Sequence, residues 1–142
     1  MKTINYILQS KPKQIFSVPR STSVFDALQF MMDKNISALL VMEDEKLCGI
    51  FSERDYARKI VLQGKSSKTT PIEEVMTSKL ITIAPQEPID RCMELMTNNH
   101  IRHLPVLESE TVVGMISIGD VVKSMIEIQK DTIAQLESYI NN

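Results

Sequence analysis

The sequence has no tryptophan, only two cysteines and four glycines among 142 residues, and no excess of charge of one sign. Its formal net charge is −2, whereas nucleic-acid-binding proteins usually present a net basic surface, so we expect no nucleic-acid partner. No apolar run approaches the roughly 20 residues of a membrane-spanning helix, and the N-terminus lacks the pattern of a secretory signal. We therefore expect no membrane partner either.

The two cysteines, Cys48 and Cys92, lie among apolar neighbours. Cysteines in such surroundings usually behave as small buried hydrophobes, and disulfides are rare in the cytoplasm. We expect a cytoplasmic protein without a metal site. A redox or metal-binding role for the two thiols is the alternative.

What the sequence does contain is an internal repeat. Shifted by sixty-five residues, Gly-Ile-Phe-Ser-Glu-Arg-Asp at 49–55 aligns with Gly-Met-Ile-Ser-Ile-Gly-Asp at 114–120, so both read Gly-x-x-Ser-x-x-Asp. The same register pairs Ser17 with Thr82. One repeat of about sixty residues is marginal as an independent fold, so we expect the two halves to pack face to face.

Hydrophobic periodicity predicts the order strand, helix, strand, strand, helix in each repeat. The first repeat has predicted strands at 15–18, 38–42 and 47–51, and the second at 80–83, 103–107 and 112–116. Ser23 is a predicted helix N-cap, and Pro88 suits the first turn of the matching helix. The second helix of each repeat begins at the motif serine, and the first of these should end near Gly64.

A short leading helix precedes each repeat. The apolar residues with helical spacing are Ile4, Ile7 and Leu8 in one and Ile72, Val75 and Met76 in the other. Their offset is sixty-eight residues, so the first lead-in carries three more residues. We predict a first repeat with its leading helix at 1–66, a second repeat at 67–128 and a C-terminal helical extension at 129–142.

The C-terminal extension has the spacing of a coiled-coil seam. Its apolar positions, with one glutamine, alternate in steps of four and three: Val122, Ile126, Gln129, Ile133, Leu136 and Ile140. This helix either packs along its own domain or contacts a second copy of the chain.

The repeated Ser-x-x-Asp has two interpretations. Ser with an acidic residue three positions later resembles a helix capping box. However, the motif occurs twice, a glycine three residues before each serine would allow a ligand to approach the backbone closely, and a strand-to-helix junction is a ready anion site. The serine could then hold a phosphate and the aspartate the two hydroxyls of a ribose.

Cationic residues gather near these motifs. Arg54 lies inside the first motif, and Arg102 and His103 open a predicted strand of the second repeat. A surface salt bridge with Glu94 or Glu108 would explain Arg102, and a structural histidine would explain His103. Both together, beside a predicted anion site, favour phosphate binding.

On these motifs the sequence resembles the tandem CBS-domain proteins, in particular the small stand-alone type that consists of one CBS pair. The resemblance rests on the doubled Gly-x-x-Ser-x-x-Asp, the segments at 35–41 and 102–106, and the lead-in at 72–77. It covers residues 4 to 128. It implies an α/β (α+β) fold in which two βαββα repeats form a pseudo-twofold pair, with an extended C-terminal helix.

The resemblance also implies two clefts that each take an adenosine-containing nucleotide. The implied ribose-binding residues are Asp55 and Asp120; the phosphate-binding residues are Ser52, Arg54, Ser117, Arg102 and His103; the adenine pockets are formed by Ser17, Val18, Ile36, Thr82, Ile83 and Ile101. In related modules the Arg/His pair of the second repeat often reaches the ligand of the first. We therefore expect the Asp55 cleft to bind the more anionic ligand.

We expect a regulatory module, with AMP as the first candidate ligand, NAD, ATP, ADP or S-adenosylmethionine as alternatives, and no catalytic cofactor. The expected partners are a second copy of the chain, as a homodimer, and a regulated protein. A ligand-free structural dimerisation module is the alternative. We expect no enzyme activity, because no nucleophile, base and orienting group are arranged together.

Overall fold

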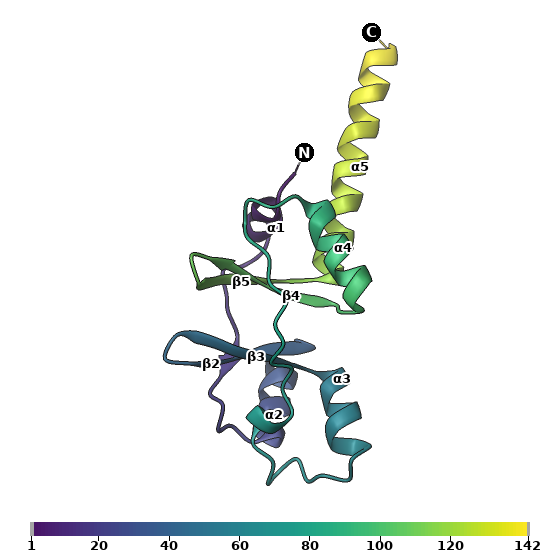
Figure 1. Cartoon of the computed structure of the whole chain (residues 1–142). Helices are drawn as coiled ribbons and strands as arrows, with labels where there is room; N and C mark the ends of the chain where they lie inside the picture. The colour runs from purple at the N-terminus through teal and green to yellow at the C-terminus, as the bar shows by residue number, and fades with distance from the viewer. Residues whose placement is uncertain (1, 142) are drawn as a thin grey trace.

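A computed structural model describes residues 2–141, and the chain forms two lobes stacked on one another (Figure 1). The first lobe contains β1 (Ser17–Val18), α2 (Val24–Lys34), β2 (Ala38–Glu43), β3 (Lys46–Ser52) and α3 (Glu53–Asp55), which continues as the π-helical turn η1 (Tyr56–Val61). The second lobe contains α4 (Ile89–Asn99), β4 (His103–Glu108), β5 (Thr111–Ser117) and α5 (Ile118–Asn141). The predicted mixed fold of two repeats is confirmed.

The two sheets differ by one strand. In the first lobe β1 runs parallel to β2, which pairs with β3 in antiparallel orientation, whereas the second lobe has only β4 and β5. The predicted strand at 80–83 is reduced to a single bridge between Ile83 and Val106. In the first lobe the Leu40 N–H donates to the Phe16 carbonyl (3.1 Å). The equivalent of Leu40 is Pro105, which has no N–H, so the pairing cannot extend in the same way.

The predicted helix starts are confirmed in part. The Ser23 side chain accepts a hydrogen bond from the Asp26 N–H, as expected of an N-cap. Pro88 occupies the N-cap position of α4 and not its first turn, so the helix starts one residue later than expected. The helix of the first motif ends at Val61, and Gly64 follows with a positive φ of 67°.

The leading segments are exchanged between the lobes. Ile4 and Ile7 of α1 (Ile4–Gln9) belong to the core of the second lobe, with Leu104 and Ile116. Ile72 of the short 3₁₀ turn η2 (Ile72–Glu74) belongs to the core of the first lobe. We expected each leading segment to accompany its own repeat, and it instead packs on the other one. The ranges 1–66, 67–128 and 129–142 stay a prediction of the unit boundaries; their outermost residues, 1 and 142, lie outside the described residues.

The motif glycines make room for the exchanged segments. A Cβ atom on Gly114 would lie 2.6 Å from Cδ2 of Leu8, and one on Gly49 would lie 2.6 Å from Sδ of Met76. Leu8 and Met76 are the equivalent residues of the two leading segments. The glycines therefore make room for these segments, and the expectation that they allow close approach of a ligand is corrected.

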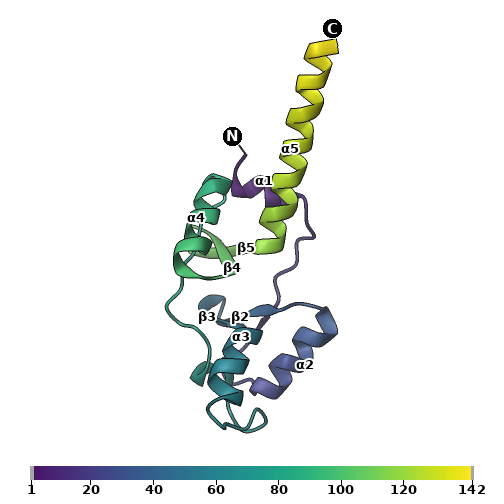
Figure 2. The ribbon, with the colours of Figure 1, turned by 90° about the vertical axis from the view of Figure 1, so that its right-hand side faces the viewer.

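Helix α5 extends far beyond the second lobe (Figure 2). Only Val121 and Ser124 of its 24 residues are buried, and every described residue from 129 onward is exposed. The predicted extension of the second motif helix past its counterpart is confirmed. Within residues 2–141, no helix combines the length and the apolar character needed to cross a membrane.

Candidate nucleotide-binding clefts

Two clefts contain the repeated motifs, and each is lined from both lobes. The first, which we call the Asp55 cleft, has a volume of about 680 Å³. Its lining residues include Ser52, Arg54, Asp55, Arg58 and Thr77 on one side and His100, Ile101, Arg102 and His103 on the other. The second, the Asp120 cleft, has about 330 Å³. Its lining residues include Ser117, Asp120 and Met115 together with Lys11, Ile15, Phe16, Ile36 and Ser37.

The two clefts meet at the centre of the molecule. Ser37 and His103 line both of them, and Ser37 Oγ lies 3.2 Å from His103 Nε2. Burial lowers the pKa of His103; Asp120 opposes this, and Lys11 and Arg102 add to it. His103 is therefore mainly neutral at neutral pH, and its ring offers one N–H donor.

Asp55 is almost fully engaged by the protein. The Ser52 N–H and hydroxyl donate to Asp55 Oδ2 (3.0 and 3.2 Å), while the Thr77 hydroxyl donates to Oδ1 (3.0 Å) and Lys59 Nζ pairs with it at 3.3 Å. The Asp55 N–H returns a hydrogen bond to Ser52 Oγ, so the capping-box interpretation is confirmed. A carboxylate offers about four acceptor positions, so a ribose at Asp55 must displace Thr77 or Lys59.

Asp120 has the same local geometry but is more open. The Ser117 N–H donates to Asp120 Oδ2 (2.9 Å), and Lys11 Nζ pairs with the same oxygen at 2.6 Å. No residue between 2 and 141 donates a hydrogen bond to Oδ1. Burial acts to raise the pKa of Asp120, but the bonds from Lys11 and Ser117 outweigh it and hold the pKa below its usual value. Asp120 is therefore ionised at neutral pH with one oxygen free to accept.

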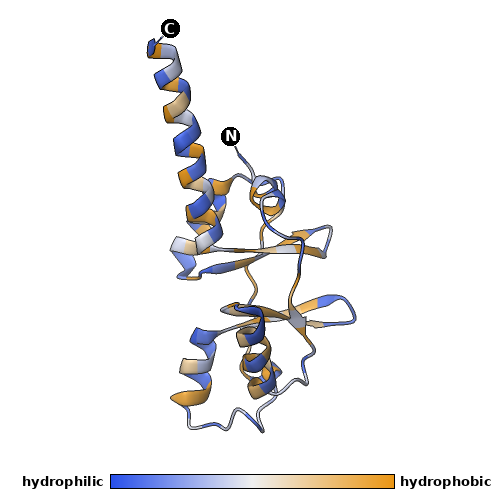
Figure 3. Ribbon diagram, turned by 180° about the vertical axis from the view of Figure 1, so that it is seen from behind, coloured by the Kyte–Doolittle hydropathy of each residue, from blue (hydrophilic) through white to orange (hydrophobic). Residues whose placement is uncertain are grey.

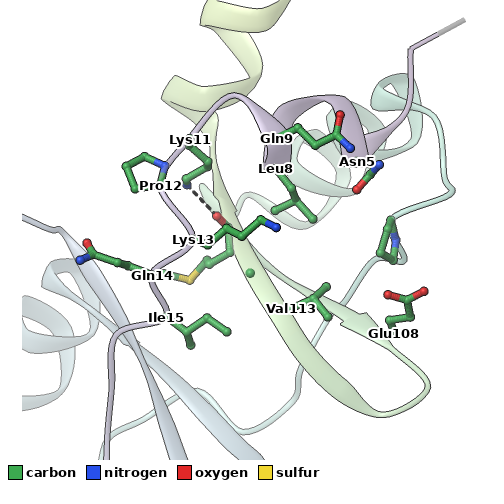
Figure 4. A pocket seen from close by; sticks show the side chains of 13 residues that line it. Asn5, Leu8, Gln9, Lys11, Pro12, Lys13, Gln14, Ile15, Glu108 and Val113 are labelled. Carbon is green, nitrogen blue, oxygen red and sulfur yellow. Dashed lines mark hydrogen bonds between the residues drawn. The ribbon is translucent and has the colours of Figure 1, made fainter.

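Lys11 was missed by the sequence analysis. It lies between α1 and β1, in the lead-in that is three residues longer than its counterpart, and this extra length was the available signal. Its ammonium also donates to the Met115 carbonyl (2.9 Å), which ties the segment to β5 (Figure 4). On its other side lies a hollow of about 340 Å³ between α1 and β5, so Lys11 separates that hollow from the Asp120 cleft.

The arginines concentrate in the Asp55 cleft. Arg54 reaches across to the second lobe and donates to the His100 carbonyl (2.8 Å), and Arg102 comes from that lobe to the same cleft. Glu94, one suggested salt-bridge partner of Arg102, pairs with Arg91 instead. In the first repeat Ser37 takes the place of Arg102, and in the second motif Gly119 takes the place of Arg54. The two clefts are therefore chemically different.

The residues predicted to contact adenine separate into two groups. Ile101 lines the Asp55 cleft and Ile36 the Asp120 cleft, as apolar walls. Val18 and Ile83 are instead buried in the cores of the two lobes, and Ser17 and Thr82 are exposed residues that line neither cleft. The role of these four residues stays a prediction.

Comparison with known proteins identifies the family to which this arrangement belongs. The CBS domain family model matches residues 12–62 and 72–127. The chain belongs to the CBS domain family. It is 40% identical to the mitochondrial CBS domain-containing protein CBSX3 of Arabidopsis thaliana, over 97% of this chain and 71% of that protein. The two matched segments make it a CBS-domain pair, as the resemblance implied.

Solved structures of CBS-domain proteins have the same fold. A protein with CBS domains from Burkholderia ambifaria is 47% identical and superimposes with a TM-score of 0.86, covering 89% of this chain and 95% of that chain. The CBS domain pair of protein MJ0100, in complex with 5-methylthioadenosine and S-adenosyl-L-methionine, is 28% identical with a TM-score of 0.78, covering 88% and 96%. That related CBS pair therefore holds adenosine-containing ligands.

Proposed function

We propose that this CBS pair is a regulatory module that binds an adenosine-containing nucleotide between its lobes. The observation that supports this most strongly is the placement, in both clefts, of an aspartate in the first turn of a helix that is capped by the motif serine. Asp55 and Asp120 bind the ribose, and Ser52 and Ser117 contact phosphate. The ligands bound to the MJ0100 CBS pair have the same adenosine core.

The nucleotide is AMP, with NAD and ATP as alternatives. Three arginines, Arg54, Arg58 and Arg102, line the Asp55 cleft, and guanidinium groups grip phosphates in a bidentate way. A ligand with a cationic sulfonium, such as S-adenosylmethionine, would meet like charges there. The Asp55 cleft therefore takes the more anionic ligand, and the neutral His103 adds one hydrogen bond from the centre.

The module has no catalytic activity of its own, and it transmits the nucleotide state to a regulated protein as a homodimer. We place it in the cytoplasm, since both cysteines are free and Cys92 is buried with its pKa raised to about 11 by burial and by Asp120. Such a thiol is unreactive, so we assign no redox role to Cys92.

A ligand-free dimerisation module is the second candidate. It is favoured by the contacts of Asp55, whose two oxygens already have partners within the chain. In that case the carboxylate would serve only to cap a helix and hold Thr77.

Mass spectrometry of the denatured, freshly purified protein separates the two candidates. We expect a copurified adenine nucleotide, reduced in Asp55→Asn and in Asp120→Asn, which keep the size of the side chain but replace one of its two acceptor oxygens with an NH2 donor and remove the charge. The exposed Asp33→Asn on α2 is the matched control and should retain the full amount. Equal nucleotide in all four proteins would reject both ribose assignments.

A further inference from the structure

Helix α5 carries an apolar stripe, interrupted at Gln129, that no part of the described chain, residues 2–141, covers. The exposed large hydrophobic residues on it are Ile118, Val122, Ile126, Ile133, Leu136, Tyr139 and Ile140. Ile133 and Leu136 expose 55% and 58% of their surface, and Ile140 exposes 78%. Figure 3 shows hydrophobic residues recurring along the whole helix, including the part that projects past the second lobe.

A projecting helix of this kind needs a partner. Isolated helices shorter than about 12–15 residues are marginal in water, and helices in proteins are stabilised mainly by packing of an amphipathic face. From residue 129 to 141 every side chain of α5 is exposed, so its own lobe supplies no such packing. The pattern of steps of four and three indicates that the missing contact is another helix.

We propose that α5 pairs with α5 of a second copy of this chain in antiparallel orientation. This inference rests on the self-association in the proposed function and is independent of nucleotide binding. We place the twofold axis of the pair beside Asp131. Ile126 then lies opposite Leu136 of the second copy, and Val122 lies opposite Ile140 of the second copy. Gln129 then lies opposite Ile133 of the second copy. Each of these contacts occurs twice, because the pair is symmetric.

The edges of the stripe decide the orientation. One edge carries Lys123, Lys130 and Glu137, each seven residues apart. In an antiparallel pair this edge faces the same edge of the second copy. Lys123 then lies near Glu137 of the second copy, and by symmetry this favourable pair forms twice. The one repulsive pair is between the two copies of Lys130, which are exposed to solvent. In a parallel pair the lysines would face Ile118 and Met125 on the opposite edge, and no opposite charges would meet.

The other edge supports the same orientation. Ile118, Met125, Thr132 and Tyr139 follow one another at intervals of seven residues. The antiparallel pair places Tyr139 of the second copy between Ile118 and Met125, whereas a parallel pair places these two apolar residues against Lys123 and Lys130 of the second copy. A shallow hollow of about 510 Å³ follows the first turns of α5, where Gly119 leaves space beside Ile118, Val122 and Ile126. The end of the second helix fills this hollow.

Sedimentation velocity of the full chain tests the surface. We expect a dimer whose Kd rises at least about tenfold in Leu136→Glu, because a charge then enters the apolar seam. Gln135→Glu adds the same charge on the next exposed residue, away from the stripe, and should leave Kd unchanged. Truncation after Ile128 should leave a folded monomer. If Leu136→Glu leaves the dimer unaffected, the proposal that α5 forms the interface is wrong, but the proposed homodimer stands. If the wild type is a monomer, both the α5 interface and the homodimer are wrong, and the nucleotide proposal is unaffected.

Charge exchange and cross-linking test the orientation. Lys123→Glu and Glu137→Lys should each weaken the dimer, and the double variant should restore it. Under oxidation, Val122→Cys mixed with Ile140→Cys should form a mixed disulfide, with the wild type and its two native cysteines as the control. Self-linked Val122→Cys, or a dimer that forms no mixed disulfide, would overturn the antiparallel pair.

Discussion

At the scale of single residues, each motif aspartate has a structural role and a proposed binding role. Asp55 completes a capping box with Ser52, and it lines a cleft with three arginines. The sequence alone offered capping and ribose binding as alternatives, and in the structure the capping carboxylate of Asp55 also lines a cleft, so capping does not exclude the proposed binding. The sequence did not show the contacts of Lys11 with Asp120 and of Thr77 with Asp55, because these span 109 and 22 residues and depend on which lobe each leading segment joins.

We predict that Asp55→Ala weakens nucleotide binding by about 1.5–3 kcal/mol, the usual range for losing a charged hydrogen-bond partner. Isothermal titration of the variant against AMP measures this, and the exposed Asp33→Ala serves as the control for a lost surface carboxylate. Circular dichroism should confirm that the helix survives without its cap. Unchanged affinity in a folded Asp55→Ala protein would reject Asp55 as a ribose ligand.

A second prediction concerns the ion pair of Lys11 with Asp120. The pKa of Asp120 is lowered in the folded state, so its contribution to stability is present above the unfolded pKa near 4 and is lost as the pH falls through the folded pKa. Lys11→Met should therefore cost about 1 kcal/mol or less at pH 7, and the difference should shrink below pH 4. Urea unfolding of both proteins at several pH values measures it. A difference that stays constant down to pH 2 would show that Lys11 acts through its packing and its bond to the Met115 carbonyl, and not through Asp120.

At the scale of elements, periodicity predicted nearly every helix and strand but not which lobe each one joins. Hydrophobic spacing identified α1 from Ile4 and Ile7, yet it carries no information on the partner of an apolar face. The lost strand at 80–83 was predictable in principle, since Pro105 removes a donor from its neighbour. The motif glycines leave the space that Leu8 and Met76 occupy, but because both repeats have this glycine it does not determine which leading segment packs on which lobe.

Because the two glycines have different neighbours, adding a methyl group at Gly49 and at Gly114 should reduce the stability of the fold by different amounts. On Gly49 it would meet Sδ and Cγ of Met76 at 2.6 and 2.8 Å and the Thr77 carbonyl at 3.0 Å. On Gly114 it would meet mainly one flexible methyl of Leu8. Gly49→Ala should destabilise the protein by about 1–3 kcal/mol, and Gly114→Ala by less. Thermal unfolding measures both variants, and a larger loss of stability in Gly114→Ala than in Gly49→Ala would contradict this packing of Leu8 and Met76.

At the scale of the whole molecule, the repeat predicts a pseudo-twofold pair with two clefts, and the structure makes those clefts unequal. The sequence anticipated part of this difference from Arg54 opposite Gly119 and from Arg102 opposite Ser37. It could not anticipate that the Asp55 carboxylate is saturated while Asp120 keeps a free oxygen. We therefore expect nucleotide in the Asp55 cleft to bind with local rearrangement of Thr77 or Lys59.

The central claim is that the clefts bind an adenosine-containing nucleotide, and isothermal titration of nucleotide-stripped protein tests it most directly. AMP, ATP, NAD and S-adenosylmethionine should be compared on the same folded sample. We predict micromolar binding, with AMP ahead of S-adenosylmethionine because three arginines line the larger cleft. Absence of binding to all four by folded protein would contradict the claim and leave the dimerisation module as the better account.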